Sequence, residues 1–248
     1  MKYFIKTILF IFIISVISCS SQNNKITLFL AGDSTIAEKI EKKRPETGWG
    51  EKIGFYFKEN VLVSNHARNG RSTRTFLSEG RWQAIIDSVK PGDYVFIQFG
   101  HNDQSRHKVD RYTTPKEYKN NLRRFIDETR AKKANPVIVT PVTRRRFTEE
   151  GKFYDVHGVY PDLAEQVAKE KNAPMLNLTS ASQKLYEKLG PEGTIPLFLH
   201  LTPGESANYP DGKEDNTHFN DHGAKVIAGL VADLIKKSNL ELKKYLKE

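Results

Sequence analysis

Four short polar segments of this chain carry the side chains that an acyl-transfer reaction needs. A serine hydroxyl follows an apolar run at Ser34, a glycine stands at Gly70, and an amide stands at Asn102. A carboxylate and an imidazole lie three residues apart near the end of the chain, at Asp215 and His218. A nucleophilic hydroxyl, a base with an orienting carboxylate, and donors for an oxyanion are the parts of an acyl-transfer site. The residue types therefore indicate nucleophilic catalysis if the fold brings these segments together.

Each of these residues also has an ordinary structural use. Ser34 could cap the helix that follows it, and Asp215 could close a hydrogen-bonded turn. Gly70 and Asn102 could be a turn glycine and a strand-end amide. For Ser34, Gly70 and Asn102 the structural use would be the better interpretation of each residue in isolation, whereas for Asp215 a role as partner of the imidazole is favoured over the turn. The presence of all four segments in one chain favours a site.

Apolar runs and helix-periodic segments alternate along the chain. Short apolar runs bounded by turn residues predict strands at 25–31, 61–65, 93–99, 136–140 and 174–178. Apolar residues three and four positions apart predict helices near 82–89, 118–126, 163–170 and 226–235. The proline-containing stretch 189–216 is expected to be a loop-rich excursion.

This order predicts an α/β fold around a parallel sheet. Continuous apolar strands joined by crossover helices require a sheet that is covered on both faces. We therefore expect a flavodoxin-like, three-layer α/β/α sandwich with a five-stranded parallel sheet. Ligands of such sheets bind beyond the carboxyl ends of the strands. Ser34, Gly70 and Asn102 each follow a predicted strand, so the fold would gather them at that edge.

The polar segments resemble the four sequence blocks of the SGNH (GDSL) hydrolase superfamily, in order and over nearly the whole chain after residue 25. The resemblance is carried by residues 32–35 (GDST), Gly70, 100–103 (GHND) and 215–218 (DNTH). Longer strings resemble the rhamnogalacturonan acetylesterase branch, namely 29–35 (FLAGDST), 48–50 (GWG), 99–103 (FGHND) and 140–145 (TPVTRR). That branch removes acetyl groups from pectin without a metal, so the resemblance implies a carbohydrate esterase with no cofactor.

The resemblance also implies a role for each residue of the site. Ser34 would attack the ester carbonyl and His218 would take up its proton. Asp215 would hold the imidazole nitrogen that faces away from the serine. The backbone N–H of Ser34, Gly70 and the Asn102 amide would form the oxyanion hole.

Further polar residues near the same edge carry weaker signals. His101 could contact substrate or simply fill the cleft. Arg144 and Arg145 could grip the carboxylates of galacturonate units, although a charge run is usually a solvated face. His218 and His222 have the spacing of a helical zinc site, but the glutamate that a zincin needs after the first histidine is absent. We therefore expect no metal, and interpret His222 as an N-terminal helix residue or a group behind the site.

Composition limits the class of protein. The 248 residues are 38% hydrophobic and 28% charged, which is typical of a globular domain and excludes a polytopic membrane protein, a collagen-like fibre and a disordered chain. A net charge of +9 favours polyanionic partners. Nucleic acid, an anionic membrane and an acidic polysaccharide fit that charge equally well. The single cysteine excludes an internal disulfide framework.

The first 18 residues predict an export signal. Two lysines precede an apolar run, 8–17, that is too short to span a bilayer. The segment 16–19 (VISC) resembles the lipobox of bacterial lipoproteins, in which Cys19 would be acylated; the alternative is a free thiol after an ordinary signal. We expect a signal peptide at 1–18, a tether at 19–25 and a hydrolase domain at 26–248. An exported lipoprotein would lie in the periplasm or at the cell surface.

On these grounds the sequence predicts a monomeric serine esterase that deacetylates rhamnogalacturonan, an acidic polysaccharide, through an acyl-enzyme. One alternative is an esterase for acetylxylan, another polysaccharide or small esters, because fold and catalytic residues do not fix the sugar. A non-catalytic carbohydrate-binding lipoprotein is another. Nucleic acid is not an expected partner, because export removes the chain from it and the site lacks an aromatic stacking platform. Contact with a membrane is expected only through the lipid anchor.

Overall fold

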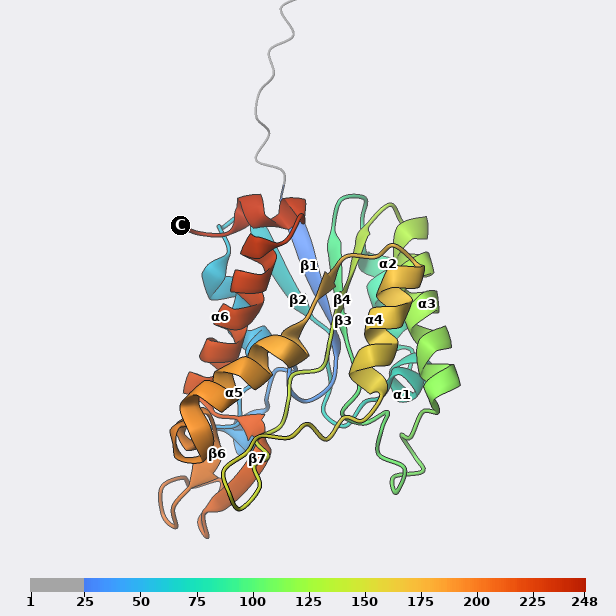
Figure 1. Cartoon of the computed structure of the whole chain (residues 1–248). Helices are drawn as coiled ribbons and strands as arrows, with labels where there is room; N and C mark the ends of the chain where they lie inside the picture. The colour runs from blue at the N-terminus through green and yellow to red at the C-terminus, as the bar shows by residue number, and fades with distance from the viewer. Residues whose placement is uncertain (1–24) are drawn as a thin grey trace, which may run out of the picture.

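Five parallel strands form the central sheet of the computed structural model, which describes residues 25–248 (Figure 1). The predicted signal peptide and Cys19 lie outside the described residues. In sheet order the strands are β2 (Val61–Asn65), β1 (Ile26–Gly32), β3 (Tyr94–Gln98), β4 (Asn135–Val139) and β5 (Met175–Leu176). This is the strand order of flavodoxin-like, doubly wound folds. The predicted five-stranded parallel sheet is confirmed.

Helices cover both faces of the sheet, as Figure 1 shows. One face carries α1 (Thr73–Ser78), α2 (Arg81–Ser88), α3 (Pro115–Ala131) and α4 (Tyr160–Glu170). The other face carries α5 (Leu178–Thr194) and α6 (Asp221–Lys237). Five short 3₁₀ helices complete the described chain, at Glu41–Lys43, Trp49–Glu51, Ile53–Tyr56, Ile195–Leu197 and Glu241–Tyr245. None of the helices in residues 25–248 combines the length and apolar character that a bilayer crossing requires.

The side chains of β1 point alternately to the two faces of the sheet, and this alternation explains the three layers of the fold. Leu28 and Leu30 pack into the core under α5 and α6, whereas Phe29 and Ala31 pack into the core under α1 to α4. Successive side chains of a strand point to opposite faces, so a strand that is apolar at every position needs a cover on both sides. The layered fold therefore follows from the composition of its central strands.

The stretch 189–216, expected to be loop-rich, contains more regular structure than predicted. Its first residues belong to α5, which is interrupted where Gly190 adopts a φ of 69°. It then forms β6 (Phe198–Leu201), which pairs antiparallel with β7 (Lys213–Phe219). The sequence pattern did not indicate this two-stranded ribbon of β6 and β7, because β6 has only four residues and most of β7 is polar. The ribbon lies at the carboxyl edge of the parallel sheet (Figure 1).

The end of the ribbon is fixed where α6 begins. Asn220 follows β7 directly, and its side chain accepts a hydrogen bond from Gly223 N at 2.9 Å, which caps the helix. The Asn220 amide also donates to the carbonyl oxygens of Pro196 and Phe198, at 2.9 and 3.0 Å. These contacts hold the last residues of β7, including His218, against the body of the protein.

Candidate active site

Segments far apart in the sequence meet in a cleft of about 580 Å³ at the carboxyl edge of the sheet. Ser34 comes from the turn after β1, Gly70 from the turn that follows β2, and Asn102 from the turn after β3. Asp215 and His218 come from β7 and not from a loop as expected. All five side chains or backbone groups border this one cleft.

The hydroxyl, imidazole and carboxylate lie within hydrogen-bonding distance of one another. His218 Nε2 is 2.9 Å from Ser34 Oγ, and His218 Nδ1 is 2.8 Å from Asp215 Oδ2. The other carboxylate oxygen accepts the backbone N–H groups of Thr217 and His218, at 2.8 and 3.0 Å. Burial alone would raise the pKa of Asp215, but these hydrogen bonds and the charge of His218 hold its pKa below the usual range. An ionised Asp215 accepts from Nδ1–H, which leaves the Nε2 lone pair facing the Ser34 hydroxyl.

A buried network holds the turn that presents Ser34. Asp33 Oδ1 accepts from Thr35 N and Thr35 Oγ1, at 2.9 and 2.8 Å. The Gln98 amide donates to Thr35 Oγ1 at 2.8 Å and accepts from Trp49 Nε1 at 3.2 Å. Gln98 is a fully buried amide in an otherwise apolar strand, a position that costs free energy unless it is hydrogen-bonded. That polar residue inside an apolar run was the available sequence signal for this support.

Three donors are available for a developing oxyanion. Within residues 25–248 the backbone N–H groups of Ser34 and Gly70 have no hydrogen-bond acceptor. The Asn102 amide donates one N–H to Arg71 O at 3.0 Å, which fixes its orientation and leaves its second N–H. Gly70 has a φ of 78°, and a Cβ there would lie 2.9 Å from Arg111 Nη1. Glycine therefore suits this turn both in backbone conformation and in space.

His101 and Arg144 lie together at the cleft. Arg144 Nε donates to His101 Nδ1 at 3.2 Å, and Arg144 Nη2 donates to His101 O at the same distance. Burial, with the nearby charges of His157 and Arg144, holds the pKa of His101 well below its usual value. A neutral imidazole can accept from the guanidinium, so His101 orients Arg144.

Behind His101 lies a histidine and carboxylate pair that the sequence reasoning missed. His157 Nε2 is 3.2 Å from His101 Nδ1, and His157 Nδ1 is 2.7 Å from Asp155 Oδ1. His157 is fully buried. No motif marks these residues, and only the fold brings them next to His101.

Arg145 does not reach the cleft. Its guanidinium donates to Thr194 Oγ1, Asn216 Oδ1 and Pro191 O, at distances of 3.1, 3.0 and 2.9 Å respectively. These acceptors belong to the end of α5 and to β7. Because its donors are already used in this way, Arg145 joins two elements behind the site, in place of the substrate contact that the sequence suggested.

The cleft is bordered by more basic than acidic side chains. Its two acidic side chains are each paired: Asp215 with His218, and Glu46 with Lys39 at 2.8 Å. The basic side chains that border it are Lys43, Lys108, Arg111, Arg144 and Lys213. The sequence pointed to only one of these five, Arg144. The others come from three distant segments, with Lys43 in the first 3₁₀ helix, Lys108 and Arg111 in the loop between β3 and α3, and Lys213 at the start of β7, so the positive surface is visible only in the fold.

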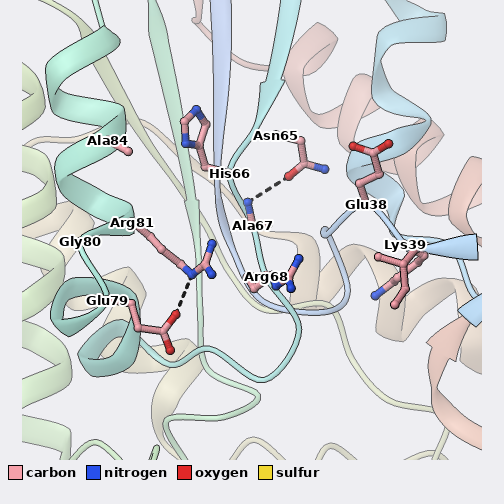
Figure 2. A pocket seen from close by; sticks show the side chains of 11 residues that line it. Glu38, Lys39, Asn65, His66, Ala67, Arg68, Glu79, Gly80, Arg81 and Ala84 are labelled. Carbon is pink, nitrogen blue, oxygen red and sulfur yellow. Dashed lines mark hydrogen bonds and ion pairs between the residues drawn. The ribbon is translucent and has the colours of Figure 1, made fainter.

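A second cavity, of about 610 Å³, lies beyond β2 (Figure 2). It is bordered by Asn65, His66 and Arg68, and by Arg81, whose Nε donates to Glu79 Oε2 at 2.7 Å. Lys39 forms part of its wall. None of the hydroxyl, imidazole and carboxylate groups of the first cleft borders this cavity, so the chemistry belongs to the first.

His222 takes no part in a metal site in this structure. It lies exposed in the first turn of α6, one of the two places that the sequence suggested for it. Residues 25–248 hold no group of three histidine, cysteine, aspartate or glutamate side chains placed to bind a metal ion.

Comparison with known proteins identifies the class. Residues 30–226 match the GDSL-like lipase/acylhydrolase family, and the chain belongs to this family. The chain is therefore a carboxylic ester hydrolase, which confirms the predicted family and class of enzyme.

The similarity to individual relatives extends over most of the chain. It is 46% identical over 221 residues to rhamnogalacturonan acetylesterase RhgT of Bacillus subtilis (strain 168), covering 89% of this chain and 94% of that protein. The crystal structure of YxiM from Bacillus subtilis superposes with a TM-score of 0.74 at 28% identity, covering 88% of this chain and 58% of that one. Axe2, an acetylxylan esterase from Geobacillus stearothermophilus, has a TM-score of 0.60 at 20% identity, covering 86% and 95%, and shares the fold.

Proposed function

We propose that this chain removes acetyl groups from rhamnogalacturonan, with Ser34 as nucleophile, His218 as general base and acid, and Asp215 as the orienting carboxylate. The observation that carries the proposal is the continuous set of contacts from Ser34 Oγ through the imidazole to Asp215 Oδ2, at 2.9 and 2.8 Å. A carbohydrate esterase is the class that the relatives support.

In the first half of the reaction, Ser34 Oγ attacks the acetyl carbonyl carbon while His218 Nε2 takes its proton. The N–H groups of Ser34 and Gly70 and the Asn102 amide bind the oxyanion of the tetrahedral intermediate. Asp215 stabilises the imidazolium. When the intermediate collapses, His218 Nε2–H gives its proton to the sugar oxygen, which leaves as a hydroxyl, and Ser34 carries the acetyl group.

In the second half, water replaces the sugar. His218 Nε2 takes a proton from the water as its oxygen attacks the acetyl-Ser34 carbonyl. The same donors bind the second oxyanion, and collapse returns the proton to Ser34 Oγ as acetic acid leaves, ionising to acetate at neutral pH. One water is consumed, and the enzyme regains its starting protonation state.

Two observations support an acidic polysaccharide as the substrate. The relative with 46% identity is named as a rhamnogalacturonan acetylesterase. The cleft also carries five basic side chains, while both of its acids are paired. Guanidinium and ammonium groups near an ester pocket suit the carboxylates of galacturonate units. The likeness to an acetylxylan esterase at 20% identity concerns the fold and does not favour xylan.

The proposal also includes the cellular location of the protein. The apolar run, the tripeptide before Cys19 and the polar stretch after it support an exported lipoprotein anchored by an acyl group on Cys19. We further propose that it acts as a monomer. Incorporation of a labelled fatty acid, which should be lost in Cys19→Ser, tests the lipid anchor. Light scattering of the domain tests whether it is a monomer.

Acetate release from defined acetylated rhamnogalacturonan and acetylated xylan, by wild type and Ser34→Ala, tests the reaction and the sugar together. We expect release mainly from rhamnogalacturonan and none above background from the serine variant. The KM for rhamnogalacturonan should rise with salt, since salt screens exposed charges, while the KM for p-nitrophenyl acetate should not. Faster acetate release from xylan, or a KM for rhamnogalacturonan that does not change with salt, would contradict the proposed substrate.

A further inference from the structure

Lys39 is buried directly behind the nucleophile turn. Its side chain is 1% exposed, and its ammonium group contacts three oxygen atoms. Nζ donates to the carbonyl oxygen of Ser34 and, at 2.8 Å, to Asn69 Oδ1. It also forms an ion pair with Glu46 Oε1 at 2.8 Å. The ammonium group of Lys39 therefore makes two hydrogen bonds and one ion pair.

The three partners belong to the three working parts of the site. Ser34 is the proposed nucleophile, and Asn69 directly precedes Gly70, whose N–H is one of the proposed oxyanion donors. Glu46 borders the cleft, and its Oε1 lies 4.0 Å from His218 Nε2. One buried cation therefore contacts the nucleophile turn, the oxyanion turn and the side chain beside the base.

A backbone contact strengthens the link to the base. Thr47, next to Glu46, donates its N–H to Phe219 O at 2.8 Å, and Phe219 follows His218 in β7. The segment that carries Glu46 is thus attached to the strand that carries the imidazole. Lys39, through Glu46, holds this segment at a fixed distance from the Ser34 turn.

The free energy of folding does not by itself explain why this ion pair is buried. Removing two charges from water is costly, and apolar side chains of similar size often stabilise a protein as well or better. Burial lowers the pKa of Lys39, opposed by the nearby charge of Glu46. At this position an ammonium group makes two hydrogen bonds and an ion pair, which an apolar side chain could not make.

We propose that Lys39 and Glu46 are positioning residues for ester hydrolysis, which align the Ser34 and Gly70 turns and place a carboxylate beside His218. The inference rests on the proposed serine mechanism. During acylation His218 becomes an imidazolium, and the Glu46 carboxylate at 4.0 Å favours that charge. Neither side chain exchanges a proton or a bond with the substrate.

The test compares kcat and KM for p-nitrophenyl acetate, a small neutral ester. Lys39→Met removes all three contacts at similar size, and we expect kcat to fall roughly 100-fold, the cost of a misplaced catalytic group. KM should change less than about twofold, because binding of a small ester does not use these residues. Glu46→Gln keeps an acceptor for Lys39 but removes the carboxylate charge, and it should lower kcat with KM unchanged.

The double variant Lys39→Met/Glu46→Met separates positioning from stability. Replacing a buried ion pair by apolar side chains is often neutral for stability, so the melting temperature should return close to that of the wild type. We expect kcat to stay roughly as low as in the single methionine variant. Arg123→Met, which breaks the 2.8 Å ion pair between Arg123 of α3 and Glu170 of α4, is a control that should leave kcat unchanged.

The outcomes distinguish this inference from the function on which it rests. An inactive wild type, or an active Ser34→Ala, contradicts the proposed function. A wild type that depends on Ser34, together with a double variant of wild-type kcat, overturns the positioning role alone. If Lys39→Met does not fold, the double variant and Glu46→Gln decide.

Discussion

Asp215→Asn tests how the carboxylate acts on the imidazole. In the wild type one oxygen accepts from His218 Nδ1 and the other from the N–H groups of Thr217 and His218. An asparagine has only one oxygen. If that oxygen keeps the two backbone donors, its NH₂ group faces Nδ1, which must then be the unprotonated nitrogen. The proton moves to Nε2, and the ring can no longer accept from Ser34 Oγ.

The size of the effect follows from the geometry. At 2.8 Å and an effective dielectric constant of ~20, the attraction between Asp215 and an imidazolium is about 6 kcal/mol. Each ~1.4 kcal/mol of barrier is tenfold in rate, which gives an upper value near 10⁴. The side chains of Asp215 and His218 are 19% and 27% exposed, so solvent screening reduces this value. We expect kcat to fall by about 10³ to 10⁴.

The assay is kcat and KM with p-nitrophenyl acetate at pH 7.5, alongside the melting temperature. Asp211→Asn, an exposed residue of the loop between β6 and β7, is the control and should leave both unchanged. A folded Asp215→Asn enzyme whose kcat is within tenfold of the wild type would refute this account of the carboxylate.

The pH dependence of stability provides a second readout of the same side chain. The folded protein holds the pKa of Asp215 below its value in the unfolded chain. Its contribution to the free energy of unfolding is therefore complete above about pH 4 to 5 and is lost as the pH falls through the folded-state pKa. The stability deficit of Asp215→Asn should shrink in acid, and a deficit that is constant down to pH 2 would contradict the shift.

Two further predictions concern a buried acid and the two arginines. Burial raises the pKa of Asp103 to about 6, so the unfolding free energy should fall as the pH rises from about 3 to about 7, by about 3 kcal/mol in total from this group. Urea unfolding of Asp103→Asn should lack this slope, and an unchanged slope would contradict the prediction. Arg144→Ala should raise KM for acidic polymer roughly tenfold and leave p-nitrophenyl acetate unaffected. Arg145→Ala should lower the melting temperature without that KM change, because its donors join α5 to β7; equal KM effects of the two variants would contradict the assignment.

The sheet and the reacting residues could be predicted because their signals are local. A strand such as β3 is apolar at nearly every position, and the turns that follow the strands carry Ser34 and Asn102. The direction of parallel strands then puts those turns at one edge. Ser34 and His218 are 184 positions apart, so the motifs, and not proximity along the chain, suggested that they meet.

Other features could not be predicted because they depend on contacts between distant segments. Lys39 lies in a stretch of alternating charges, and nothing in that stretch distinguishes a buried ammonium from its solvated neighbours. Arg144 and Arg145 are adjacent and identical in type, yet one borders the cleft and the other binds the end of α5. Arg144 is directed by His101 and Arg145 by α5 and β7, and the sequence pattern did not reveal either contact.

The most direct test of the central claim is to locate the residue that a fluorophosphonate esterase inhibitor modifies, by peptide mass mapping, while esterase activity is followed in the same samples. The account predicts one phosphonyl group per chain on Ser34, with activity lost in proportion to labelling. Inactivation with the group on another residue, or full activity with Ser34 occupied, would contradict it.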